Sequence, residues 1–193
     1  MKNTALKFLV AATALVLLSG CIVLSVYPFY TEKDLTFDAG IVGRWAKDGA
    51  NNEFWQFADV DGKYYRLVTT DDQSTNALDA HLFHLKKYQF LDLLSTNREM
   101  LQMPVHLISK VTRTDDKMSL QFLDYGWLSS LLETNPAVLR HIVIPQDYSD
   151  TNNGNMVYLT ADTKDLQRFL LLHAEDTNAF NPNSTTELKR VPQ

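Results

Sequence analysis

Three short polar turns, each between aromatic-rich segments, constrain the fold of this chain most strongly. In chain order they are Asp61-Gly62, Lys86-Lys87 and Asp115-Asp116. An Asp-Gly pair between β-forming segments is a strong hairpin signal, because glycine tolerates the positive φ that tight turns require. We therefore predict three successive β-hairpins between residues 52 and 125.

The third hairpin indicates which side chains share a face of the sheet. Because successive side chains of a strand point to opposite faces, Leu107, Ser109 and Val111 are expected on one face. Two residues of the next strand are placed to oppose them across the pair. By the same alternation we expect five residues to be among the most buried, namely Trp45, Trp55, Phe57, Leu120 and Phe122.

Two segments change from the strand period to the helix period. Asp124 is placed to cap a helix near 125–135, which Pro136 would end. Asp162 is placed to cap a second helix near 162–174. Three further short strands are expected at residues 141–144, 155–160 and 185–191.

Together these elements predict a mainly β fold, with an α+β arrangement as the alternative. About eight strands in an antiparallel meander would form either a closed barrel or a strongly curved sheet, accompanied by the two short helices. We place this single β-rich domain at residues 39–193, a length that supports one hydrophobic core.

The N-terminus has the pattern of an export signal. Lys2 and Lys7 precede an apolar run without charges, and the small pair Ser19-Gly20 precedes Cys21, the only cysteine of the chain. Leu18-Ser19-Gly20-Cys21 resembles the lipobox of bacterial lipoprotein precursors. The alternative is an uncleaved transmembrane anchor, since the run is near the lower length limit for a span.

The lipobox resemblance implies a processed and lipidated protein. Residues 1–20 would be a signal peptide cleaved between Gly20 and Cys21, and the Cys21 thiol would carry the lipid. We therefore expect a protein of the cell envelope, bound to a membrane through covalent lipid on Cys21. Ile22 stands where aspartate favours retention in the inner membrane, so the resemblance favours the outer membrane, facing the periplasm, in an organism that has one.

Residues 21–38 would form the lipid-anchored tether between the membrane and the domain. This segment carries the four aromatic residues Tyr27, Phe29, Tyr30 and Phe37. Disordered linkers are poor in aromatic residues. We therefore expect part of the tether to dock on the domain; insertion of these side chains in the membrane interface is the competing possibility.

Charge and cysteine content narrow the possible partners. The formal net charge is −5, and loss of the two lysines in residues 1–20 would make it −7. Nucleic acid and anionic headgroups select basic surfaces, so we expect no nucleic-acid partner. With one cysteine, assigned to lipid, neither a disulfide within the chain nor a cysteine-based metal site can form.

Gly43-Arg44-Trp45 opens the first expected strand of the domain and resembles the Gly-x-Trp motif of lipocalins. In that family the tryptophan closes one end of the barrel beneath an arginine from late in the chain, and Arg190 is the candidate here. The helix near 162–174, followed by a short strand, also fits the family plan, whereas the helix near Trp127 interrupts the meander. The resemblance implies a carrier for a small apolar ligand; without it, Trp45 is an ordinary core aromatic residue.

Catalytic and metal-binding motifs are not found in the sequence. It contains no Gly-x-Ser-x-Gly, no phosphate-binding glycine loop and no His-Glu-x-x-His. His81 and His84 would point to opposite faces of a strand, and we expect all five histidines to be structural. The expected protein therefore has no metal site, no cofactor and no enzymatic activity.

Three functions remain open at this point. The first is a non-enzymatic envelope lipoprotein that displays its β-rich domain for a structural role or for contact with an envelope protein. The second is a lipocalin-like carrier of a small apolar ligand, which needs an unfilled barrel interior. The third is a hydrolase, which needs a concave site that gathers two or more acids with His106 or His141.

Overall fold

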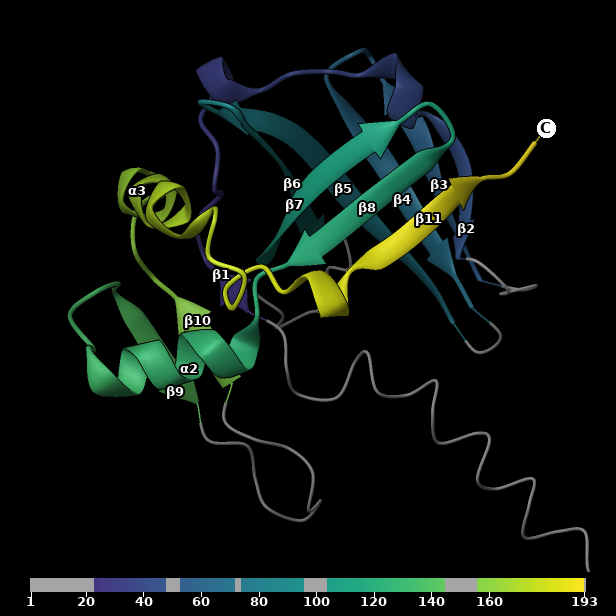
Figure 1. Ribbon diagram of the computed structural model, residues 1–193. Helices are drawn as coiled ribbons and strands as arrows, with labels where there is room; N and C mark the ends of the chain where they lie inside the picture. Colours follow the sequence, from purple (N-terminus) through teal and green to yellow (C-terminus); the bar gives the residue numbers. More distant parts are fainter. Residues whose placement is uncertain (1–22, 48–52, 72–73, 96–103, 145–155, 193) are drawn as a thin grey trace, which may run out of the picture.

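The computed structural model describes residues 23–47, 53–71, 74–95, 104–144 and 156–192. Gly20 and Cys21, the residues of the expected cleavage and lipidation, lie outside these ranges. Over the described residues the fold is mainly β, with two α-helices to one side of a barrel (Figure 1).

Eight antiparallel strands close into an up-and-down barrel. Each strand pairs with the next one in the series, and the last pairs with the first, so the sheet is a barrel rather than an open curved sheet. In order around the barrel the strands are β2 (Gly43–Lys47), β3 (Phe54–Val60), β4 (Tyr64–Thr70), β5 (Thr75–Leu85), β6 (Tyr88–Ser95), β7 (His106–Thr114), β8 (Lys117–Phe122) and β11 (Thr186–Arg190).

The three predicted hairpins are confirmed. Their strands pair as β3 with β4, β5 with β6 and β7 with β8. Asp61 and Gly62 have φ of 55° and 64°, the left-handed conformation that made Asp-Gly a turn signal. In the third hairpin Val111 is opposite Leu120 and Ser109 is opposite Phe122, as the alternation predicted.

An insertion between β8 and β11 departs from the expected meander. It consists of α2 (Tyr125–Thr134), β9 (His141–Ile144), β10 (Met156–Leu159) and α3 (Thr163–His173). The two helices were predicted, and their caps are as expected: Asp124 accepts from the Trp127 N–H at 2.8 Å and Asp162 from the Asp165 N–H at 3.0 Å.

The strands β9 and β10 lie outside the barrel, although we expected them within the meander. β10 pairs antiparallel with β9 and parallel with β1 (Leu24–Ser25), which in turn pairs with β7 at Ser25 and His106. The three strands thus form a small sheet attached to one edge of the barrel wall, beside α2 (Figure 1). β11, not β9, takes the place next to β8 and closes the barrel.

The N-terminal segment before β2 docks on the barrel and on α3. Phe29 is fully buried, and the Thr36 N–H donates to the carbonyl of Leu82 on β5. From α3, Thr163 donates to the Pro28 carbonyl and Gln167 to the Phe29 carbonyl. Two 3₁₀ helices, η2 (Glu32–Asp34) and η3 (Ala39–Ile41), complete the segment, and a third, η4 (Pro182–Ser184), precedes β11. Docking of residues 23–38 agrees with the expectation from their aromatic content.

Two hydrophobic cores lie on the two sides of the barrel wall. Along β6, Leu91 and Leu93 point into the barrel, whereas Phe90 points outward to the second core. The second core is covered by α2, α3 and the small sheet, through residues such as Leu128, Leu170 and Val157. Of the five residues expected to be most buried, Trp45, Phe57 and Leu120 are fully buried, and Trp55 and Phe122 pack half-buried against the barrel core.

Candidate functional site

The first candidate site is the end of the barrel where β2 begins and β11 ends. The Arg190 guanidinium lies 4.3 Å above the ring centroid of Trp45, and its Nη1 donates to the Val42 carbonyl at 2.9 Å. Nη2 of Arg190 donates to the Gly40 carbonyl, and the Trp45 indole N–H donates to the Ile41 carbonyl at 2.8 Å. The arrangement that the lipocalin resemblance implied for Trp45 and Arg190 is therefore present.

Backbone conformation favours glycine at position 43, and a close contact with Arg190 adds to this preference. The φ of Gly43 is +131°, a conformation that side chains disfavour. A Cβ atom at this position would also stand 2.7 Å from Nη1 of Arg190. The Gly-x-Trp pattern thus has a local cause: glycine leaves room for the arginine that covers the tryptophan two residues later.

A second polar group ties the N-terminal segment to the same end of the barrel. Asp38 forms an ion pair with Arg113 at 2.9 Å, and its backbone exchanges hydrogen bonds with the Tyr65 hydroxyl. Burial alone would raise the pKa of the Asp38 carboxyl group. The hydrogen bond from Arg113 outweighs this effect and lowers the pKa below its ordinary value. Burial raises the pKa of Tyr65 to about 12. At neutral pH Asp38 therefore stays ionised and Tyr65 stays neutral, and both groups hold the N-terminal segment to the barrel.

The barrel interior is occupied by its own side chains. Among the described residues, thirteen that are buried form this core, including the large side chains of Trp45, Phe57, Tyr65, Leu82 and Met118. Small barrels are filled in this way when they hold no ligand. Trp55, the direct partner of Trp45 across β2 and β3, is half-buried, as are Leu107 and Phe122 near the start of β7 and at the end of β8.

A buried polar cluster on the outer wall of the barrel is the most unusual chemical feature of the described residues. Asp92 on β6 is fully buried, and its Oδ1 lies 2.7 Å from Nδ1 of His106 on β7. Its other oxygen accepts from the backbone N–H of Phe29 at 2.9 Å. One carboxylate therefore joins β6, β7 and the docked N-terminal segment.

This cluster contains residue types used in hydrolysis, but its geometry supports a structural role. The hydroxyl of Ser25, on the strand next to His106, donates to the Tyr27 carbonyl at 2.7 Å. Ser25 and Asp92 are fully buried and His106 is 7% exposed, so the cluster has little access to a substrate. It joins one acid to His106, whereas His141 contacts the Leu139 carbonyl elsewhere. No group of three or more metal-ligating side chains occurs within the described ranges.

Next to this cluster, His81 lies between two tyrosine rings. Its centroid is 4.8 Å from that of Tyr30 and 5.0 Å from that of Tyr64, and both rings are stacked on it. Its buried Nδ1 has no hydrogen-bond partner among the described residues. Burial lowers the pKa of His81 below its ordinary value of 6.5, although the negative charges of Asp92 and Asp79 act in the opposite direction.

Substitution of His81 by phenylalanine should make folding stability less dependent on pH. The unfolded chain takes up the His81 proton near pH 6.5, whereas the folded chain needs a lower pH. The unfolded state then binds more protons as the pH falls below 6.5, so stability decreases in that direction. Urea denaturation at several pH values from 7.5 to 5 measures this slope in wild type and in His81→Phe, which retains the stacking.

His84, an exposed histidine of the same strand, provides the matched control for this experiment. His84→Phe shows how much the slope changes when another histidine of β5 is removed, and His81→Phe should reduce the slope by more than this control. An equal slope in wild type and His81→Phe would contradict the assignment of this proton to His81.

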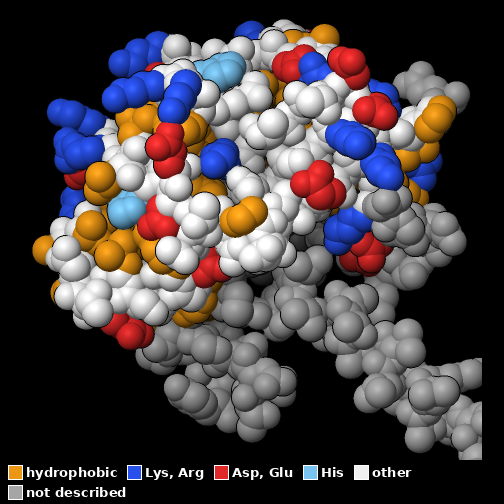
Figure 2. All heavy atoms as spheres, viewed as in Figure 1, with side chains coloured by type: hydrophobic (Ala, Val, Ile, Leu, Met, Phe, Trp, Pro, Cys, Tyr) orange, Lys and Arg blue, Asp and Glu red, His pale blue; other side chains and the backbone are white. Residues whose placement is uncertain are grey.

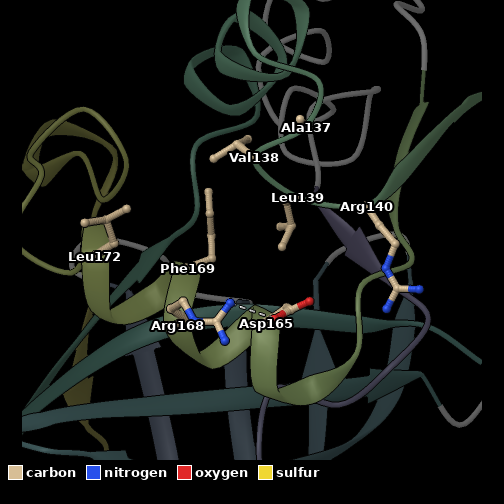
Figure 3. A pocket seen from close by; sticks show the side chains of 8 residues that line it. All are labelled: Ala137, Val138, Leu139, Arg140, Asp165, Arg168, Phe169 and Leu172. Atoms are coloured by element: carbon tan, nitrogen blue, oxygen red, sulfur yellow. Dashed lines mark hydrogen bonds and ion pairs between the residues drawn. The ribbon is translucent and has the colours of Figure 1, made fainter.

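Two cavities among the described residues lie outside the barrel. One of about 220 Å³ is enclosed by residues 137–140 and one side of α3, with Val138, Leu139 and Phe169 forming its apolar part (Figure 3). Its two arginines are both paired with carboxylates, Arg168 with Asp165 and Arg140 with Asp162. The other, of about 580 Å³, is a broad depression beside α2 and includes Trp127. Neither adjoins the polar cluster or the barrel interior.

The surface is mixed in charge. Figure 2 shows acidic and basic side chains interspersed over the face seen in Figure 1, with hydrophobic side chains among them on the left, where α2 and α3 lie.

Within the described residues, no helix has the length and apolar character needed to cross a membrane.

Comparison with known proteins gives no match to a family model, to a curated protein or to a solved structure.

Proposed function

We propose that this chain is an envelope lipoprotein, anchored through lipid on Cys21, whose barrel acts without catalysis as an interaction or structural domain at the membrane surface. The proposal follows the lipobox at residues 18–21, with residues 1–20 as the signal peptide. Ile22 favours the outer membrane, facing the periplasm, in an organism that has one. The partner expected there is another protein of the envelope.

The observation that carries this proposal is the position at which the folded domain begins. Val23 is 3% exposed and belongs to the second core, and Leu24 starts β1. The folded domain thus starts within three residues of the proposed lipidation site. A lipid there would hold the barrel directly against the membrane rather than at the end of a long tether.

The filled barrel interior supports an interaction role over transport. Ligand sites for small molecules usually have volumes of about 300 Å³ or more. The side chains that would line such a site, including Phe57 and Leu67, are fully buried against one another. We therefore expect a partner to bind the outer surface of the barrel or of the elements attached to it.

A lipocalin-like carrier is the second candidate. The closed eight-strand meander and the Arg190–Trp45 contact favour it, and half-buried Trp55 and Phe122 offer apolar surface beside the barrel core. Titration of the protein with a fluorescent fatty acid separates the two candidates. Saturable binding at one site per chain that Trp55→Ala abolishes would favour the carrier.

Substitution of Cys21 by alanine tests the proposed anchor. The variant should lose its acyl groups and either leave the membrane fraction or remain as the uncleaved precursor, because one thiol carries the attachment. Detergent partitioning and the mass of the N-terminal peptide measure both results. Ile22→Asp is the matched control: it keeps the thiol, should remain acylated, and should move to the inner membrane in a cell with two membranes. A Cys21→Ala protein that still carries acyl chains would contradict the proposal.

A further inference from the structure

The small sheet of β1, β10 and β9 has one covered face and one uncovered face. Val157 and Leu159 of β10 point into the second core, where α2 packs. Because side chains alternate along a strand, Met156 and Tyr158 point to the opposite face. The Tyr158 hydroxyl lies 3.9 Å from the sulfur of Met156, which places both side chains on that face.

The strand register extends this face across all three strands. Tyr158 is opposite Ile142 on β9 and Leu24 on β1, and Met156 is opposite Ile144. Opposed residues of neighbouring strands share a face. We call these five positions the apolar sheet face; they are Leu24, Ile142, Ile144, Met156 and Tyr158.

The apolar sheet face carries no charged side chain and is open to its surroundings. Ile142 and Ile144 are 47% and 45% exposed, and the other three members are half-buried. In Figure 1 α2 lies in front of β9 and β10, on the other side of the small sheet. Contiguous exposed apolar surface of this kind marks contact with a protein or a membrane.

The short stretch of chain between Cys21 and β1 favours a membrane over a protein as the surface that this face contacts. Leu24 is three residues from Cys21, and three extended residues span at most about 11 Å. Neighbouring strands are about 4.8 Å apart, so β9 lies about 10 Å from β1 across β10. A lipid on Cys21 therefore brings every member of the apolar sheet face within about two nanometres of the acyl chains.

We propose that the apolar sheet face is seated in the interfacial region of the lipid bilayer that holds the anchor, with the isoleucines of β9 inserted among the headgroups. This inference rests on the proposed function, since lipid on Cys21 supplies the proximity. The acidic net charge of the chain makes the contact one of apolar side chains with zwitterionic lipid rather than one of basic residues with anionic headgroups. Tyr27, 49% exposed and three residues after Leu24, is of the type found at such interfaces.

The chain offers a direct test, because its single cysteine is blocked once it is acylated. A cysteine introduced as Ile144→Cys in the full-length, acylated protein can then be labelled selectively with an environment-sensitive fluorophore. The labelled protein is reconstituted in phosphatidylcholine vesicles, with and without a lipid-borne quencher. Val143→Cys, equally exposed but facing the α2 side, and Lys63→Cys, exposed in the distant β3–β4 turn, are the controls.

The expected result is a blue-shifted emission at position 144 that the lipid-borne quencher reduces at least twofold more than at 143, with no quenching at 63. Emission at 144 that matches position 63 would overturn the inference. Emission at 144 that is blue-shifted but not quenched, with cross-linking between chains, would overturn it in favour of a second copy. Both of these leave the proposed function intact, provided that mass spectrometry shows acylated Cys21. Labelling of Cys21 itself would show a free thiol and overturn both.

Discussion

Replacing Trp45 by alanine should lower the free energy of unfolding by about 3–5 kcal/mol, the range for truncation of a buried aromatic side chain. Trp45 is fully buried in the barrel core, and its indole N–H is bonded to the Ile41 carbonyl. The truncation would also leave the Arg190 guanidinium above a void at the closed end of the barrel. Loss of packing, of the hydrogen bond and of the cation–π contact therefore coincide at one site.

Urea denaturation of a soluble chain starting at Ile22 measures this effect. Trp45→Phe, which keeps an aromatic ring beneath Arg190 but loses the N–H, should cost less than the alanine variant. Leu172→Ala is the surface control, since Leu172 is 72% exposed and such changes usually stay within about 0.5 kcal/mol. A loss below about 1 kcal/mol for Trp45→Ala would show that the closed end does not depend on this residue.

The hairpins of the sheet were predictable because their signals are local, whereas closure into a barrel depends on the pairing of β11 with β2 and of β6 with β7 and stayed open. Hairpin turns such as Asp61-Gly62 fix which strands are neighbours, and the period-two pattern around Val111 and Leu120 fixes which faces meet. The contact of Trp45 with Arg190 was predictable for a different reason. It joins residues 145 positions apart, and only the family resemblance of Gly43-Arg44-Trp45 pointed to it.

The small sheet could not be predicted, because its pairings are long-range and its strands are short. β1 has two residues, and its parallel pairing with β10 joins Leu24 to Tyr158. Nothing near residue 24 signals that partner. The segments 141–144 and 155–160 were expected as strands, but their composition does not distinguish a barrel strand from a strand of an attached sheet.

The buried cluster around Asp92 was missed for a related reason. Its one sequence signal is a carboxylate within the apolar segment 90–94. Its partners come from two distant segments: His106 from the next strand, diagonal to Asp92 rather than directly opposite, and the Phe29 N–H from the N-terminal segment. A charge in an apolar strand indicates that a partner must exist, since a buried charge without one is costly, but not which residue it is.

Removing the Asp92 carboxylate is expected to have the second large effect. Asp92→Ala should cost about 3–5 kcal/mol, because it leaves His106 and the Phe29 N–H buried without their partner. Asp92→Asn is the matched variant: its side-chain oxygen can still accept from Phe29, so its cost should be smaller. The double variant Asp92→Leu/His106→Leu has no buried histidine without a partner. It should therefore be more stable than Asp92→Ala.

A second measurement separates loss of the hydrogen bond between Asp92 and Phe29 from general destabilisation of the protein. The Asp92 carboxylate holds the backbone at Phe29, while Thr163 and Gln167 of α3 hold the neighbouring carbonyls. In Asp92→Ala, hydrogen exchange of residues 27–37 should therefore accelerate more than exchange of β2 and β3, which lie across the barrel from β6 and β7. Uniform acceleration in all these strands would instead show that Asp92 stabilises the barrel as a whole. Exchange of residues 27–37 as slow as in wild type would show that α3 alone keeps the N-terminal segment docked, and that the Asp92 carboxylate does not hold this segment to the barrel wall.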